Sequence, residues 1–139
     1  MRYCISSGFM GRMGLSGDIL ALGTEQWALV QEAMQFYTHA RAVLKDCTIA
    51  VYRELKTDSV RYAEGLQAVL FTGRNSSALL VCHSFSNAGS HSLSFPFPAK
   101  QLRLSAQFGF IDALSVADGR ACLAEMPDHE TCALLFELV

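Results

Sequence analysis

Residues 8–45 read GFMGRMGLSGDILALGTEQWALVQEAMQFYTHARAVLK, and this stretch decides the fold. In its second half, apolar side chains recur at three- and four-residue spacing, which is the spacing of one face of an α-helix. Thr24 or Gly23 supplies the N-cap, and Glu25 lies in the first turn, where the helix dipole favours an acidic side chain. We therefore expect one long amphipathic helix that ends near Lys45.

Two neighbouring rows of side chains make the apolar sector of this helix wide. The first row is Trp27, Val30, Met34, Tyr37, Arg41 and Leu44, and the second is Leu29, Ala33, Phe36, Ala40 and Val43. One small β-sheet normally covers a narrower sector than these rows define. We infer that the helix lies between two bodies.

After Cys47 the period of the apolar residues changes from that of a helix to the two-residue period of β-strands. Strands are expected at residues 48–54, 66–72, 78–85, 92–97, 101–106, 114–117, 120–126 and 131–139. The stretch 78–85 is apolar enough to be central in a sheet, and Asp118-Gly119 is a favoured two-residue hairpin turn. Short strands with frequent turn residues indicate a mainly β fold: an antiparallel Greek-key β-sandwich of seven or eight strands, preceded by the helix.

Composition and charge exclude several classes of function. The net charge is −2 and the pI about 6.0, so nucleic acid or an anionic membrane surface is not an expected partner. Charged residues make up 17% of the chain and hydrophobic residues 51%, a shortage of charge that suggests surface buried against a partner. No membrane span or leader is recognisable, so we expect a soluble, cytoplasmic protein.

The residues able to bind metals or react do not form a known motif. The five cysteines are scattered without a CxxC pair, so we interpret them as buried free thiols and expect neither metal nor cofactor. Cys82 and His83 are adjacent in a predicted strand and point to opposite faces. The four histidines are His39, His83, His91 and His129. None has a catalytic context in the sequence, and we expect His83 to face solvent or to be satisfied within its strand.

Several segments together resemble one enzyme family. Leu15, residues 16–19 (SGDI) and residues 22–26 (LGTEQ) resemble the end of the catalytic barrel in α-galactosidase-type, melibiase-like glycoside hydrolases. Residues 67–70, 78–84 and 127–137 resemble the C-terminal sandwich that follows the barrel. The resemblance implies that residues 1–46 are the last strand (3–14), loop and helix of a (β/α)₈ barrel, and that residues 47–139 are the C-terminal antiparallel β-sandwich domain.

The resemblance also implies that this chain is not active alone. In the family, two aspartates on earlier barrel strands perform the hydrolysis, and the Lys-x-Asp nucleophile motif is absent because Lys45 and Asp46 are adjacent. We expect a truncated, inactive part of an enzyme of carbohydrate metabolism. Arg12 and Asp18 would lie at the rim of the sugar pocket and bind substrate. In the alternative, Asp18 accepts backbone N–H bonds of its loop and Arg12 is its ion-pair partner.

Two functions remain open at this point. In the first, the chain is a non-catalytic module that packs on the missing catalytic barrel and stabilises it, and that self-associates when alone through its exposed helix and first strand. In the second, it is a carbohydrate-binding module acting on its own, which would require exposed aromatic side chains for sugar rings to stack on. Phe95, Phe97, Phe108 and Phe110 alternate as core residues do, which favours the first function.

Overall fold

The computed structural model describes residues 1–55, 63–88, 93–112, 114–123 and 125–139. Its helices are α1 (Arg2–Ser7), the 3₁₀ helices η1 (Gly8–Met10) and η2 (Ile19–Ala21), and α2 (Thr24–Leu44). Its strands are β1 (Cys47–Leu55), β2 (Gly65–Gly73), β3 (Ser77–Ser84), β4 (Leu93–Pro96), β5 (Leu102–Gly109), β6 (Leu114–Ala117), β7 (Arg120–Leu123) and β8 (Thr131–Leu138).

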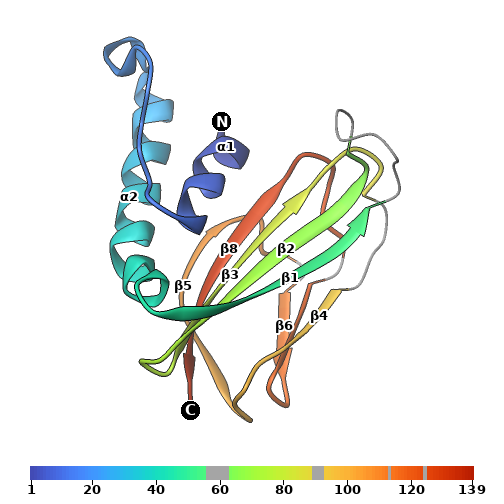
Figure 1. Ribbon diagram of the computed structural model, residues 1–139. Helices are drawn as coiled ribbons and strands as arrows, with labels where there is room; N and C mark the ends of the chain where they lie inside the picture. The colour runs from blue at the N-terminus through green and yellow to red at the C-terminus, as the bar shows by residue number, and fades with distance from the viewer. Residues whose placement is uncertain (56–62, 89–92, 113, 124) are drawn as a thin grey trace.

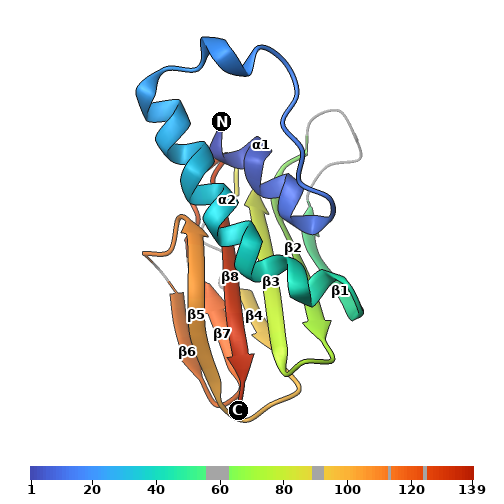
Figure 2. The same ribbon diagram turned by 90° about the vertical axis from the view of Figure 1, so that its left-hand side faces the viewer.

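The strands form two antiparallel sheets that confirm the predicted sandwich. One sheet has the order β1-β2-β3-β8-β5, and the other has the order β4-β7-β6. The helices lie on one face of the five-stranded sheet and the three-stranded sheet lies on the opposite face (Figure 1). Seen from the helix side, α2 runs diagonally across the strands of the larger sheet (Figure 2). The molecule therefore has three layers and two cores.

Strand β3 is the centre of this arrangement, as its apolar sequence predicts. Because side chains alternate along a strand, Leu79 and Val81 face the core beneath the helices, whereas Leu80 and Cys82 face the core between the sheets. All four are fully buried. A strand covered on both faces needs apolar residues at every position, which explains the unbroken run in the sequence.

Helix α2 begins and packs as its sequence indicates. Gly23 is the N-cap, and its backbone N–H donates to the Gln26 side-chain oxygen at 2.9 Å. The buried face consists of Val30 from the first predicted row and of Ala33, Phe36, Ala40 and Val43 from the second, whereas Leu29 of the second row is only half-buried. Trp27 and Met34 of the first row remain 36% and 54% exposed. The prediction that the apolar sector is wider than the sheet covers is thus confirmed.

The hairpin between β6 and β7 also has the predicted turn. Asp118 and Gly119 have φ angles of 49° and 69°, the pair of positive values that a type I′ turn requires. A Cβ atom on Gly119 would lie 2.2 Å from the carbonyl oxygen of Ala99. Glycine is therefore required there by both conformation and space.

The predicted strand at residues 3–14 is wrong. Arg2–Ser7 forms α1 and Gly8–Met10 forms η1. Ile5 and Phe9, four residues apart, point into the core beneath α2. Without neighbouring barrel strands, an extended segment would leave its N–H and C=O groups unpaired, whereas a helix pairs them internally. The expected self-association through a first strand is therefore not available, because residues 3–14 form no strand.

Candidate functional site

The most unusual feature of the described residues is a buried polar cluster beneath α1, formed by Ser6, His83 and Thr131. His83 comes from β3 and Thr131 from β8, and all three residues are almost fully buried. The His83 Nε2 atom lies 2.9 Å from the Ser6 hydroxyl oxygen. The Thr131 hydroxyl oxygen lies 2.6 Å from the Ser6 oxygen and 2.9 Å from the carbonyl oxygen of Cys82.

Counting hydrogens assigns the tautomer of His83 in this cluster. The Ser6 hydroxyl oxygen also lies 2.9 Å from the Tyr3 carbonyl oxygen, so Ser6 and Thr131 share four contacts: with that carbonyl, with the imidazole, with each other and with the Cys82 carbonyl. Each hydroxyl has one hydrogen. A hydrogen on His83 Nε2 adds a third donor to the cluster, whereas a hydrogen on Nδ1 would leave only the two hydroxyl hydrogens for the four contacts. We therefore assign the neutral imidazole with its hydrogen on Nε2.

The surroundings of His83 favour this neutral form. Burial lowers the pKa of His83 below its ordinary value of 6.5, and a hydrogen bond to the Tyr3 backbone opposes that shift only in part. The Tyr3 ring meets the imidazole edge to face, with the ring centroids 4.8 Å apart. No carboxylate in the described part of the chain contacts the imidazole.

The cluster is not a serine nucleophile site. Ser6 is fully buried and cannot meet a substrate. Ser7 is exposed, and its hydroxyl oxygen lies 3.3 Å from His83 Nε2. Within the described residues, however, no carboxylate orients the imidazole, as a catalytic triad requires. The arrangement holds α1 on the sheet, and the sequence interpretation of His83 as a satisfied strand histidine is confirmed.

A second polar contact set ties the turn at residues 127–130 to the segment after β3. The Asp128 carboxylate accepts the backbone N–H groups of Asn87 and Ala88, each at 3.0 Å. These bonds, led by that of Ala88, lower the pKa of Asp128 below its ordinary value of 3.8. His129 Nε2 lies 3.2 Å from the Ser86 hydroxyl oxygen at the surface. His91, the remaining candidate histidine, lies outside the described residues.

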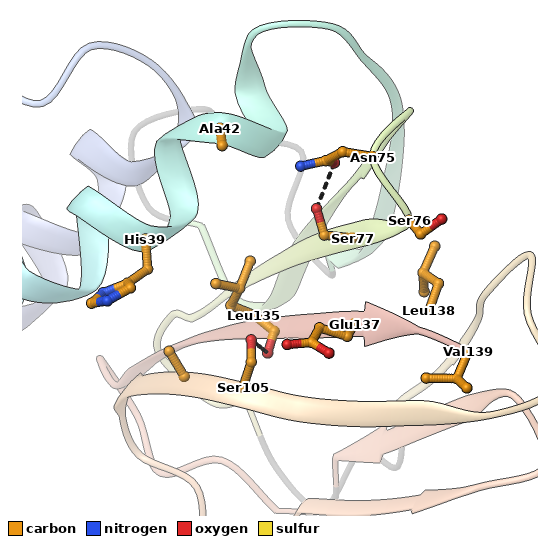
Figure 3. A pocket seen from close by; sticks show the side chains of 11 residues that line it. His39, Ala42, Asn75, Ser76, Ser77, Ser105, Leu135, Glu137, Leu138 and Val139 are labelled. Carbon is orange, nitrogen blue, oxygen red and sulfur yellow. Dashed lines mark hydrogen bonds between the residues drawn. The ribbon is translucent and has the colours of Figure 1, made fainter.

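A cavity of about 500 Å³ opens between α2, the start of β3, the middle of β5 and the C-terminal end of β8 (Figure 3). Most of its polar side chains already have partners. The Ser77 hydroxyl donates to the Asn75 side-chain oxygen at 2.6 Å, and the Ser105 hydroxyl donates to the backbone of β8. Glu137 pairs with Arg103 on β5. The His39 ring points away from Asn75 and Glu137 in Figure 3, so these groups do not converge on a ligand.

Five large apolar side chains between Leu15 and Met34 are exposed in the helical layer; they are Leu15, Ile19, Leu20, Trp27 and Met34, which we call the outer apolar strip. Leu20, at the centre of η2, is 88% exposed. Leu15 and Met34 border a shared groove of about 380 Å³ beside α2. Isolated apolar side chains are common on surfaces, whereas apolar side chains that border a shared groove, as Leu15 and Met34 do, are typical of contact surfaces.

The structure does not bring the predicted sugar-rim residues into a site. Arg12 and Asp18 are exposed in the irregular segment between η1 and η2. The Asp18 side chain makes no capping hydrogen bond at η2, so the alternative in which it caps its loop is wrong. In the residues that the structure covers, Arg12 and Asp18 form no ion pair with each other. Their role in substrate binding stays a prediction.

The cysteines and the acidic residues provide no metal centre in the described residues. All five cysteines are free. Only Cys82 and Cys132 are buried, whereas Cys47 and Cys122 are half-buried and Cys4 is exposed, which corrects the interpretation of all five as buried thiols. Cys82 and Cys132 face each other across β3 and β8. Their hydrogen bond, together with burial, raises the pKa of Cys82. No helix in the described part has the length and apolar character needed to cross a membrane.

Sequence reasoning missed the polar cluster for a clear reason. Ser6 is 77 residues from His83 and 125 residues from Thr131, so no local motif links them. The only available signals were a histidine in an otherwise apolar strand and two adjacent serines in the N-terminal segment.

Comparisons with protein-family models, curated proteins and solved structures gave no match.

Proposed function

We propose that this chain is the non-catalytic C-terminal module of an α-galactosidase-like glycoside hydrolase and that it stabilises the catalytic barrel by packing against it. The residues that resemble that family run from Leu15 to Gln26 in the helical layer and continue into the sandwich. In this role the module performs no chemistry. Its contribution is apolar surface and a rigid three-layer support.

The outer apolar strip is the observation that carries the proposal. Its residues lie in and beside the segment that resembles the barrel end, and the five-stranded sheet leaves them exposed. Burying a leucine or methionine side chain stabilises a contact by about 1.5–3 kcal/mol. Burial of Leu20 and Met34 by a partner would therefore contribute to the free energy that stabilises the assembly.

The alternative, an independent carbohydrate-binding module, has less support. Sugar rings stack on exposed aromatic faces, but Phe95, Phe97 and Phe108 are buried. Trp27 is partly exposed, yet it belongs to the outer apolar strip on α2. Titration with galactosides while Trp27 fluorescence is recorded separates the two functions. A saturable change in fluorescence would favour glycan binding.

A chimera tests the stabilising role. Residues 15–139 of this chain replace the last barrel helix and the sandwich of an α-galactosidase of the resembled type, whose own last barrel strand is kept because residues 3–14 form no strand here. Hydrolysis of p-nitrophenyl α-galactoside is then followed after heating. The double substitution Leu20→Glu with Met34→Glu should lower the temperature of half-inactivation, because it places charge in the apolar contact. Equal inactivation temperatures for the two chimeras would refute the proposal.

Val116→Glu is the matched control for this experiment. Val116 is an exposed apolar residue on β6 of the other sheet, away from the helical layer. The control chimera should keep the inactivation temperature of the unsubstituted chimera. The isolated chain should also self-associate less when the outer apolar strip carries the two glutamates, which sedimentation measures directly.

A further inference from the structure

The buried imidazole under α1 suggests a conformational device that is independent of the proposed function. We propose that His83 is an acid-operated latch: its neutral imidazole holds residues 2–10 on the five-stranded sheet, and its protonation releases them while the sandwich stays folded. The segment to be released consists of α1 and η1, which precede every strand of the chain.

The polar contacts of the released segment depend on the imidazole. Ser6 is bonded to both His83 and Thr131, and Ser7 also lies within 3.3 Å of His83. With its single hydrogen on Nε2, the imidazole donates into α1 and buries no unpaired N–H. A second proton on Nδ1 would create a charged donor in a residue that is 3% exposed. A buried charge without a partner is strongly unfavourable.

The groups facing His83 carry no negative charge, and the hydrogen bond to the Tyr3 backbone offsets the cost of protonation only in part. From α1 they are Tyr3, Ser6 and Ser7, and from β8 the facing group is Thr131. Gln67 is the residue directly opposite on β2 and is uncharged. Of these groups only Tyr3 is titratable, and burial raises the pKa of its phenol, so it stays neutral in acid.

One charged pair also joins α1 to the turn before β8. Arg2 and Glu130 are 3.9 Å apart at the surface, where an ion pair contributes little. Their interaction is separate from the imidazole, and a Glu130 variant isolates it. The latch therefore predicts that most of the pH dependence belongs to His83.

Release can be local because α1 and η1 take no part in either sheet. In the part of the chain that the structure describes, the strands pair with one another, and an irregular segment follows η1. When residues 2–10 leave, Phe9 withdraws from Phe36 and Phe108, whose ring centroids lie 4.9 and 5.1 Å from its own. Acid would thus expose apolar surface beneath α2 without breaking a strand pair.

The sign of the effect follows from proton linkage. The folded-state pKa of His83 is lowered, so the released state binds the proton more tightly than the docked state. Docking is strongest above about pH 6.5 and weakens as the pH falls towards the lowered pKa. In that window the equilibrium constant for release should rise by up to about tenfold per pH unit.

Hydrogen–deuterium exchange with mass spectrometry tests the latch on the whole chain between about pH 7.5 and 4.5, after correction for intrinsic exchange rates. Protection of residues 2–10 should fall with pH by up to about tenfold per unit, while β3 and β8 keep theirs. In His83→Gln, protection of the same segment should lose most of its pH dependence. His39→Gln, at an exposed histidine on α2, should behave like the unsubstituted chain, and Glu130→Gln should retain most of the pH dependence.

Three results would overturn the latch. They are pH-independent protection of residues 2–10, an undiminished pH dependence in His83→Gln, or simultaneous loss of protection in α1 and β3. If His83→Gln does not fold, proton NMR of the unsubstituted chain provides a second measurement. The His83 ring should then titrate below its ordinary pKa, and its titration should coincide with the loss of α1 protection. Separate midpoints would contradict the proposal.

Discussion

Replacing Phe9 by alanine should destabilise the protein by about 3–5 kcal/mol. Phe9 is fully buried beneath α2, and its ring meets those of Phe36 and Phe108 at centroid distances of 4.9 and 5.1 Å. Loss of apolar burial accounts for about 2 kcal/mol. Two aromatic contacts add about 0.5–1.5 kcal/mol each. The substitution tests whether the N-terminal segment is part of the core.

Urea unfolding followed by circular dichroism measures the loss of stability, and hydrogen exchange locates it. Because residues 2–10 can detach, Phe9→Ala should reduce protection of α1 more than protection of β3. Met34→Ala, at an exposed position on α2, is the matched control and should change stability by less than about 0.5 kcal/mol. A loss below about 1 kcal/mol in Phe9→Ala, with α1 protection unchanged, would refute the packing of Phe9 described above.

Three further substitutions test separate features. Gly109→Ala should lower the free energy of unfolding by more than about 2 kcal/mol in thermal unfolding, because φ is 89° and the new Cβ would lie 2.2 Å from the Thr131 carbonyl oxygen. Gly14→Ala is the control and should leave the stability nearly unchanged, because open space surrounds Gly14. Thr131→Val keeps the shape but removes the hydroxyl that meets Ser6, so urea unfolding should show a loss of about 1–3 kcal/mol. Asp128→Asn should reduce the fall of the melting temperature with pH below about pH 4. A lowered carboxyl pKa stabilises the fold at pH values above the unfolded-state pKa, and this stabilisation disappears as the pH falls through the folded-state pKa. An unchanged fall of the melting temperature would contradict that role.

The β half of the fold was predictable because its signals are local. Alternating apolar residues mark each strand, and Asp118 with Gly119 marks the hairpin without reference to distant residues. The N-terminal segment was not predictable in this way. Phe9 and Ile5 fit a helix, but the glycines and apolar residues that follow suggest an extended strand. Whether neighbouring strands are present decides between these structures, and the sequence pattern does not contain that information.

The candidate sites also differ in how much of each one the sequence could predict. Arg12 and Asp18 were proposed from a family resemblance, and the structure leaves both exposed without bringing them together. The outer apolar strip was foreseeable in part, because Trp27 and Met34 follow the helical period. Leu20 joins the strip only because η2 leaves it exposed beside the start of α2.

The amino-acid sequence by itself determined the long helix, the positions of most strands and the central place of β3, because each depends on the periodicity of neighbouring residues. Only the tertiary structure decided that residues 2–10 fold as helices and that Ser6, His83 and Thr131 meet. Those three residues lie far apart in the chain, and their hydrogen bonds form only after the sheet has aligned β3 with β8. Contacts between distant residues leave no periodic pattern, so packing alone creates the polar cluster.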